Sequence, residues 1–192
     1  MLTGVIVVVV LSLVVGVPRL LRQTARQKKL RKIAVAKIGT LAPGPHIVRV
    51  VGTARAVGAA TTAGPYSGTP GVAAVFERWD SQRIQRLDRQ VRHVPFVVED
   101  ETGSVQIALE HADFALELLP VKLAETGPNR VFGAGIIAAN REAAGDTLEC
   151  VVKPGDRLAV VGYVYARPDG LVLAGTAASP VVVSNDPVLL AS

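Results

Sequence analysis

The sequence has only one cysteine, Cys150, and aromatic residues make up only 4% of its 192 residues. One cysteine excludes an intramolecular disulfide and a cysteine-rich zinc site. A lone thiol suits a reducing compartment, and such a cysteine is more often a packing residue than a nucleophile. Because aromatic side chains are scarce, Val and Ala must supply most of the core, which favours β-structure in the Val-rich parts.

Sequence motifs of enzymes are also absent. The chain has no Gly-x-Ser-x-Gly elbow, no phosphate-binding loop and no Gly-x-Gly-x-x-Gly pattern. His93 and His111 are candidate partners for Cys150, but nothing in their spacing favours a catalytic arrangement. We therefore expect no catalytic residues, no cofactor and no metal site.

One long uncharged run, Leu2 to Val17, stands at the start of the chain. As a helix it would be roughly 24 Å long, and residues 1–21 would reach roughly 31 Å, against a hydrocarbon core of about 30 Å. A signal peptide is less favoured, because no Lys or Arg precedes the run and no Ala-x-Ala site follows it. A core strand seldom contains sixteen apolar residues. The sequence predicts a membrane anchor over residues 1–21, with a signal peptide and a core element as the alternatives.

The charges are divided unevenly along the chain. Eight of the 21 Lys and Arg lie within the first 37 residues, which hold no Asp or Glu. The remainder is therefore slightly acidic, and the basic segment predicts contact with anionic lipid headgroups rather than with nucleic acid. Because basic residues flanking a span stay in the cytoplasm, we expect the N-terminus outside and the C-terminal domain in the cytoplasm. The expected lipid-facing residues are Arg19, Arg22, Arg26, Lys28, Lys29, Arg31 and Lys32.

Residues 22–45 are expected to form a basic juxtamembrane helix and a linker. The stretch from Arg19 to Lys37 contains no Gly or Pro and is rich in helix formers, and Gly39 is a plausible helix stop. Strand-like alternation begins at His46, and residues 46–184 are assigned to one β-domain. Within it, a hairpin with strands Val91–Val98 and Ser104–Leu109 is the clearest unit.

The rest of the domain is less regular. Strands are predicted over His46–Arg55, Val72–Trp79, Arg157–Ala166, Leu171–Gly175 and Pro180–Ser184. Ala112–Leu119 is expected to form a short helix, and Val121–Asp146 a long insertion. Three arginines, Arg83, Arg86 and Arg89, are spaced as on a helix and form either an anion site or, more simply, part of a solvated hairpin tip or short helix. Residues 185–192 are expected to be a loose tail.

Two turn motifs resemble those of a small OB-type barrel. One is Asp100-Glu101-Thr102-Gly103-Ser104-Val105, and the other begins Pro154-Gly155-Asp156 and continues to Gly162. The predicted fold is therefore mainly β: a small OB-like barrel, preceded by one transmembrane helix and a basic juxtamembrane helix.

With the N-terminal span included, the sequence is similar to the GIDE family, the "beside a membrane" domain of mitochondrial-type E3 ubiquitin ligases. The resemblance lies in short islands between about residues 45 and 175. Its motif residues, which we expect to be structural, are Pro65, Ser67, Gly68, Pro95, Phe96, Asp100, Gly103, Glu149, Gly155, Asp156 and Gly162.

The resemblance implies a ligase label, but the family's ubiquitin chemistry resides in a RING finger. A RING takes eight Cys and His zinc ligands, and this sequence has one Cys and three His. We therefore expect a membrane-anchored, non-enzymatic interaction or scaffold module with an unknown protein partner. The alternative is a tethered OB-type domain that binds nucleic acid or oligosaccharide, although the acidic balance of the body makes nucleic acid unfavourable.

Overall fold

The computed structural model describes residues 28–80, 82, 85–121 and 147–191. The chain divides into two compact units, Met1–Lys32 and Ile33–Ser192. Among the described residues, no helix is both long and apolar enough to cross a membrane. The predicted span over residues 1–21 lies outside them, as do Arg19, Arg22 and Arg26 and nearly all of the predicted insertion.

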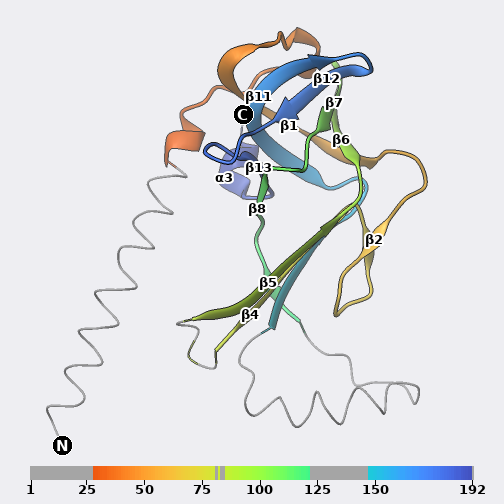
Figure 1. Cartoon of the computed structure of the whole chain (residues 1–192), viewed down its shortest axis with the longest axis vertical. Helices are drawn as coiled ribbons and strands as arrows, with labels where there is room; N and C mark the ends of the chain where they lie inside the picture. The colour runs from red at the N-terminus through yellow and green to blue at the C-terminus, as the bar shows by residue number, and fades with distance from the viewer. Residues whose placement is uncertain (1–27, 81, 83–84, 122–146, 192) are drawn as a thin grey trace, which may run out of the picture. The chain divides into compact units, whose positions relative to one another are not determined.

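A closed five-stranded barrel forms the centre of the second unit (Figure 1). Its strands are β1 (Gly44–Ala56), β6 (Phe96–Asp100), β7 (Gly103–Ile107), β11 (Arg157–Arg167) and β12 (Gly170–Ala174). The ring closes because β1 pairs with both β6 and β11, while β12 joins β11 to β7. The β7–β12 pairing is parallel and the others in the ring are antiparallel. The prediction of a mainly β domain with a small barrel is confirmed.

Alternating side chains explain why these strands close. On β11, which lies where the sequence predicted a strand, Leu158, Val160 and Val164 are buried and belong to the core cluster. Gly162 lies on the same face of the strand, and a Cβ there would lie 2.9 Å from the carbonyl oxygen of Ala174. The barrel interior is thus filled by branched aliphatic side chains, with glycine where two segments approach most closely.

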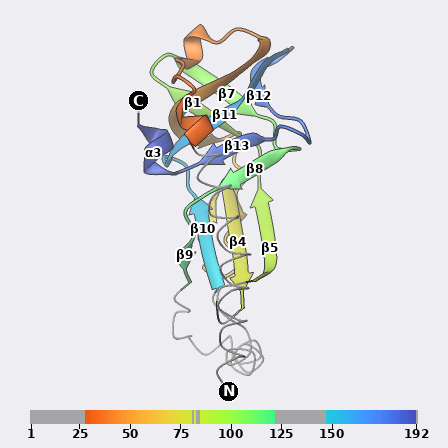
Figure 2. The ribbon, with the colours of Figure 1, turned by 90° about the vertical axis from the view of Figure 1, so that its left-hand side faces the viewer.

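A second, four-stranded sheet continues from the barrel. Figure 2 shows its three longer strands side by side. The sheet has the order β5 (Arg86–His93), β4 (Ala73–Trp79), β10 (Thr147–Val152), β9 (Leu119–Pro120). Its central residues Val75 and Val152 belong to the same hydrophobic cluster as the barrel interior. The two sheets therefore share one core.

The remaining elements are short. They are η1 (Ile38–Thr40), β2 (Thr62–Ala63), β3 (Pro70–Gly71), β8 (Ala112–Ala115), β13 (Val181–Ser184) and α3 (Pro187–Leu190). β2 and β3 pair as a small hairpin, and β13 extends the barrel sheet by pairing with β11 on one side and β8 on the other.

Two predicted elements in the middle of the chain are wrong. Ala112–Leu119 is not helical: residues 112–115 form β8, which pairs in parallel with β13 and buries Phe114. This tertiary pairing outweighs the local helix propensity of the segment. The predicted strand Val91–Val98 is two strands, because the chain leaves β4 after His93 and joins β1 at Phe96.

The predictions at the two ends of the domain also need correction. The helical residues described near the N-terminus end at Arg31 rather than Lys37. Val35 instead forms a bridge with Arg49, whose carbonyl accepts the N–H of Ala36 at 2.8 Å. The predicted loose tail contains α3, which is capped by Asp186 and anchored by the buried Leu189.

Candidate functional site

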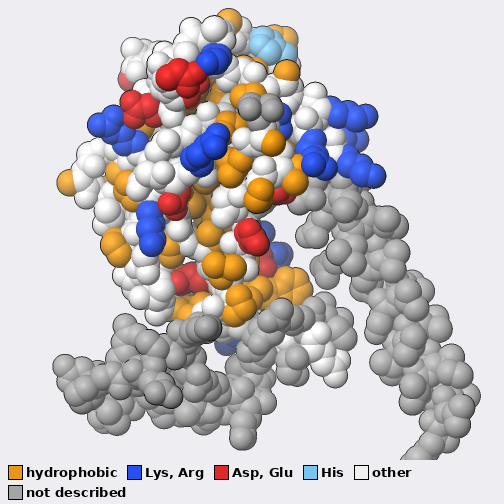
Figure 3. All heavy atoms as spheres, turned by 180° about the vertical axis from the view of Figure 1, so that it is seen from behind, with side chains coloured by type: hydrophobic (Ala, Val, Ile, Leu, Met, Phe, Trp, Pro, Cys, Tyr) orange, Lys and Arg blue, Asp and Glu red, His pale blue; other side chains and the backbone are white. Residues whose placement is uncertain are grey.

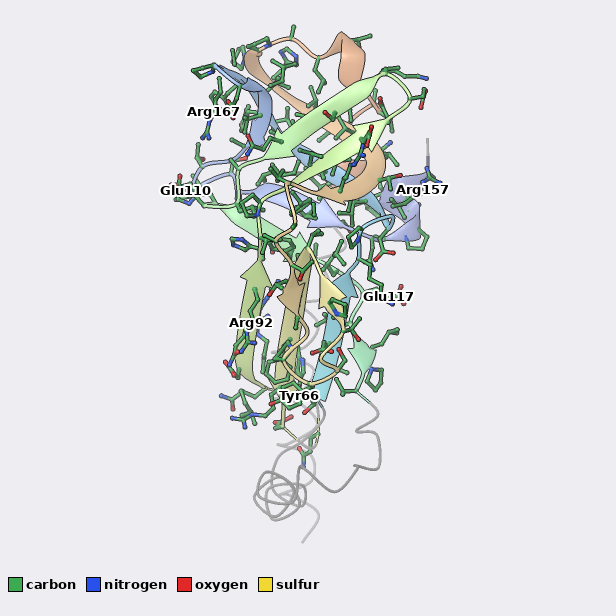
Figure 4. The ribbon with its side chains drawn as sticks, turned by 90° about the vertical axis from the view of Figure 1, so that its right-hand side faces the viewer. Tyr66, Arg92, Glu110, Glu117, Arg157 and Arg167 are labelled. Carbon is green, nitrogen blue, oxygen red and sulfur yellow. The ribbon has the colours of Figure 1, made fainter. Side chains whose placement is uncertain are left out.

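The first cluster of motif residues is built around Glu149 on β10. The backbone N–H of Tyr66 donates to Oε1 of Glu149 at 2.9 Å, and that of Ser67 donates to Oε2 at 3.1 Å. The Tyr66 ring stacks on Phe76, with 4.5 Å between ring centroids. Glu149 is only 8% exposed, so its carboxylate fixes the loop between β2 and β3 from inside the domain. Figure 4 shows Tyr66 on this hairpin, in front of the second sheet.

Glycines allow the loop to close over this carboxylate. A Cβ on Gly64 would lie 2.8 Å from Oε2 of Glu149 and 2.5 Å from the Ser67 hydroxyl. Gly68 has a φ of +66°, a backbone conformation that residues other than glycine rarely adopt. Ser67 accepts the N–H of Thr69, and Pro65 precedes the stacked Tyr66. Pro65, Ser67 and Gly68 therefore shape a turn whose function in this structure is to receive Glu149.

The second cluster surrounds Asp100, at the turn between β6 and β7. Oδ1 of Asp100 accepts the Thr102 N–H at 2.7 Å, the Thr102 hydroxyl at 2.6 Å and the Gly103 N–H at 3.1 Å. Its Oδ2 accepts the N–H of Ile38 at 2.9 Å, and the Thr102 hydroxyl oxygen accepts the N–H of Gly39 at 2.7 Å. The turn thus holds η1, the segment through which the chain enters the barrel.

Electrostatic interactions strengthen the contact between this turn and η1. Burial by itself would raise the pKa of Asp100, but the hydrogen bonds from Thr102 and from the backbone of Ile38 and Gly103 outweigh it and hold the pKa below 3.8. Beside it, Lys37 forms a hydrogen-bonded ion pair with Glu101, which raises the pKa of the lysine and lowers that of the glutamate. We call these contacts between Lys37–Gly39 and Asp100–Gly103 the entry clamp.

The remaining motif residues close the barrel. Asp156 accepts the Lys153 N–H at 2.8 Å, and Gly155, with a φ of +98°, completes that turn and donates its N–H to the carbonyl of Ala54. Phe96 is fully buried, and the Pro95 carbonyl accepts the N–H of Val57. The sequence placed Gly155 and Asp156 in a turn but Pro95 and Phe96 in a strand, and the structure distributes the motif residues over three separate places rather than one site.

Four of the expected lipid-facing residues lie in the described part of the chain, Lys28, Lys29, Arg31 and Lys32, and all four are exposed. Over the face seen in Figure 3, acidic side chains are spread between basic and hydrophobic ones. A nucleic-acid surface normally gathers charge of one sign, so this face does not resemble one.

A polar network that the sequence did not reveal lies on β4 and β5. Glu77 is buried and accepts hydrogen bonds from Nε1 of Trp79 at 3.0 Å and from Arg86 at 2.9 Å, while Nε of Arg89 lies 3.6 Å from it. On a regular strand, residues 86 and 89 would face opposite sides. The irregularity in pairing between Arg78 and Trp79 brings both arginines to one carboxylate. Arg86 and Arg89 therefore support the sheet, and Arg83 lies outside the described residues.

Arg49 is a second buried charge that the sequence did not reveal. It is 6% exposed, its Nε has no hydrogen-bond partner among the described atoms, and its terminal nitrogen lies 3.5 Å from the carbonyl oxygen of Leu189. The sequence carried one signal for this buried charge, a basic residue within a Val-rich strand. That signal is ambiguous, because strands with one solvated face also carry basic residues.

Cys150 is the only thiol, and burial, followed by the nearby Asp156, Glu117 and Glu149 carboxylates, raises its pKa to about 11. A neutral thiol is a poor nucleophile, so the geometry supports the packing interpretation. Among the described residues, no group of three or more His, Cys, Asp or Glu side chains is placed to hold a metal ion.

No curated protein and no solved structure showed a significant match. The family model GIDE, described as an E3 ubiquitin ligase family, matches residues 74–188, from β4 to α3. This match spans more than half of the chain. It includes the Asp100 turn and Glu149, but not the Pro65–Gly68 loop that binds the Glu149 carboxylate. The chain therefore belongs to the GIDE family.

Proposed function

We propose that this GIDE protein is a membrane-anchored, non-enzymatic interaction module that works at the cytoplasmic face of the cell membrane. The anchor would be residues 1–21. The basic residues that follow would lie against anionic headgroups, each contributing up to about 1 kcal/mol near the surface. The GIDE domain would present its loops and sheet edges to a protein partner.

The entry clamp is the observation that carries this proposal. The clamp fixes the point at which the chain joins the barrel, which would give a tethered domain a defined attachment to its anchor. Three contacts join Lys37–Gly39 to Asp100–Gly103, one ion pair and two hydrogen bonds, and they would hold the point at which the tether meets the barrel.

The family description does not by itself bring ubiquitin transfer to these residues. The sequence offers one cysteine and three histidines, whereas a RING finger takes eight such ligands. We therefore place the proposed activity in recognition rather than in catalysis.

Topology is the direct test. A reporter that fluoresces only in the cytoplasm is fused to Ser192, a matched fusion carries an export-dependent phosphatase, and the membranes are fractionated. Fluorescence in the membrane fraction supports the proposal. Phosphatase activity, or a soluble processed chain, would show that Leu2–Val17 is an export signal.

A charge variant sharpens this test. Replacing Arg19, Arg22, Arg26, Lys28 and Lys29 by Gln removes most of the flanking charge and leaves the apolar run intact. The orientation should become mixed, because the charge bias that fixes it is gone. The matched control replaces Lys153, Arg157 and Arg167 by Gln, since these exposed residues lie far along the chain from the span.

A second candidate function is the binding of single-stranded nucleic acid or oligosaccharide. The five-stranded barrel favours it, because OB-type barrels bind such ligands on one face. Salt-sensitive binding of labelled single-stranded DNA by the full chain, retained in the Gln variant above, would place this function first.

A further inference from the structure

Strand β5 forms an outer edge of the second sheet, and it pairs with β4 on one side only. Just beyond the ends of β5 and β4, the N–H of Val94 donates to the carbonyl of Val72 at 2.9 Å. Val72 and Val94 therefore form a hydrogen-bonded pair that continues the β4–β5 ladder. Because such pairs alternate in an antiparallel ladder, Arg92, Gln90 and Asp88 also bond to β4. The backbone N–H and C=O groups of Arg89, Val91 and His93 therefore point away from the sheet.

These outward groups are not paired within the described part of the chain. β5 pairs only with β4 there, and outside the strand pairings no backbone hydrogen bond involves the N–H of Arg89, Val91 or His93. The side chain of Val91 is 40% exposed and that of Leu87 is 46% exposed. The opposite edge of this sheet, β9, is only two residues long. β5 is thus an unusually long open edge, of the kind that natural proteins normally shorten or cover.

The charged residues of β5 indicate which class of partner this edge would bind. Of its exposed residues, the charged ones are Arg86 and Arg92, while the strand's only acid, Asp88, is partly buried. Glu77 lies behind the edge and is shared by Arg86 and Arg89. Figure 4 shows Arg92 on β5, the outer strand of this sheet. Pairing of two β5 strands would bring arginines together, so the charge disfavours a second copy and favours an acidic partner.

We propose that β5 binds an extended peptide segment with alternating acidic and apolar residues, which adds to the second sheet as a new strand. Backbone hydrogen bonds to Arg89, Val91 and His93 would supply the binding energy. Arg92, on one face of the strand, would select the acidic residues, and Val91, on the other face, would contact the apolar ones. This proposal gives the interaction role proposed above a surface and a partner class, but it does not depend on the membrane anchor.

The test measures fluorescence anisotropy of a labelled probe peptide, Ac-Glu-Val-Glu-Val-Glu-Val-Glu-amide, with the full chain in detergent. Two isomers carry N-methyl groups either on the Glu or on the Val amides. In a docked strand only one set of amides faces the protein, so one isomer should bind at least about tenfold more weakly than the other. A peptide with Lys in place of Glu should not bind.

Two protein variants complete the test. Val91→Pro removes an outward N–H but leaves the β4 ladder intact, and should weaken probe binding at least about tenfold. Val91→Ala removes the same side chain but keeps the N–H, and should bind within about threefold of the wild type. If Val91→Pro does not fold, the two methylated isomers still decide the question on the wild-type protein.

Three results would overturn the proposal: no binding at millimolar probe, equal affinity of the two isomers, or equal affinity of the Pro and Ala variants. Self-association that Val91→Pro abolishes would instead assign the edge to a second copy of the chain. Because the probe assay uses detergent-solubilised protein, its result is independent of the topology experiment.

Discussion

The clearest prediction concerns Glu149, whose carboxylate holds the loop of the small hairpin. In Glu149→Gln, the amide oxygen can still accept one backbone N–H, from Tyr66 or Ser67. The amide NH2 group must then face the other N–H, leaving two donors opposed in a buried position. The change keeps the size of the side chain and alters only its charge and hydrogen bonding.

The magnitude follows from these contacts. A hydrogen bond to a charged group contributes about 1.5–3 kcal/mol, and an unsatisfied buried donor costs about 1–3 kcal/mol. Removing a buried charge recovers part of its desolvation cost, so we expect a net loss of about 2–4 kcal/mol in unfolding free energy. For a domain of this size, that loss lowers Tm by roughly 4–16 °C.

The assay is thermal unfolding followed by far-ultraviolet circular dichroism, with the full chain in detergent. Glu110→Gln is the matched control, because Glu110 is exposed and lies away from the loop (Figure 4). Chymotrypsin supplies a local readout: cleavage after Tyr66 should be faster in Glu149→Gln, since the loop is no longer held. A Tm within about 1 °C of the control, with unchanged cleavage, would refute the reasoning.

Three further predictions concern single residues. The pKa of Asp100 is lower in the folded protein than its ordinary value of 3.8, so its stabilising contribution is present above pH 3.8 and is lost as the pH falls through the folded pKa. Hydrogen exchange of the Ile38 amide should therefore accelerate in that acidic range. In Asp100→Asn the same amide should exchange fast already at pH 7. With its pKa near 11, Cys150 should react with N-ethylmaleimide at pH 8 at least about a hundredfold more slowly in the native protein than in guanidinium chloride, and comparable rates would show that the thiol is activated. Arg49→Met should leave Tm unchanged or raise it, because Nε of Arg49 has no described partner and its hydrogen bond to Leu189 is long; a fall of several degrees would show that the guanidinium has a stronger partner than the structure describes.

The elements that the sequence predicted correctly are those with local signals. The hairpin of β6 and β7 has alternating apolar residues on both sides of the Asp100–Gly103 turn, and β11 is apolar over most of its length, with Leu158 and Val160 buried. Turn residues with positive φ, such as Gly155 and Gly170, mark where the strands reverse. Period and turn chemistry depend on neighbouring residues, so they can be read without knowledge of the fold.

The elements that the sequence missed depend on distant partners. Ala112–Ala115 is a strand only because β13, far along the chain, pairs with it. The last residues form α3, in which Leu189 is buried and its carbonyl oxygen lies 3.5 Å from the Arg49 guanidinium. Local propensity favoured a helix in the first case and predicted nothing in the second, and tertiary contacts decided both.

The candidate site divides in the same way. The sequence identified Glu149, Asp100 and the Pro65–Gly68 loop as motif residues. It did not show that Glu149 binds the loop across 83 positions or that Asp100 holds Ile38 across 62. Nor did it show that β5 forms an open edge, because an edge is defined by the absence of a neighbouring strand.

The sequence by itself thus determined the uncharged run, the basic segment, the β-rich character of the domain and its family. These properties depend on composition, period and short motifs, which are local. Only the tertiary structure decided which carboxylate receives which backbone groups, how the barrel closes, and which strand is left with unpaired hydrogen-bonding groups. Those outcomes depend on contacts between residues far apart in the chain, and no local pattern encodes them.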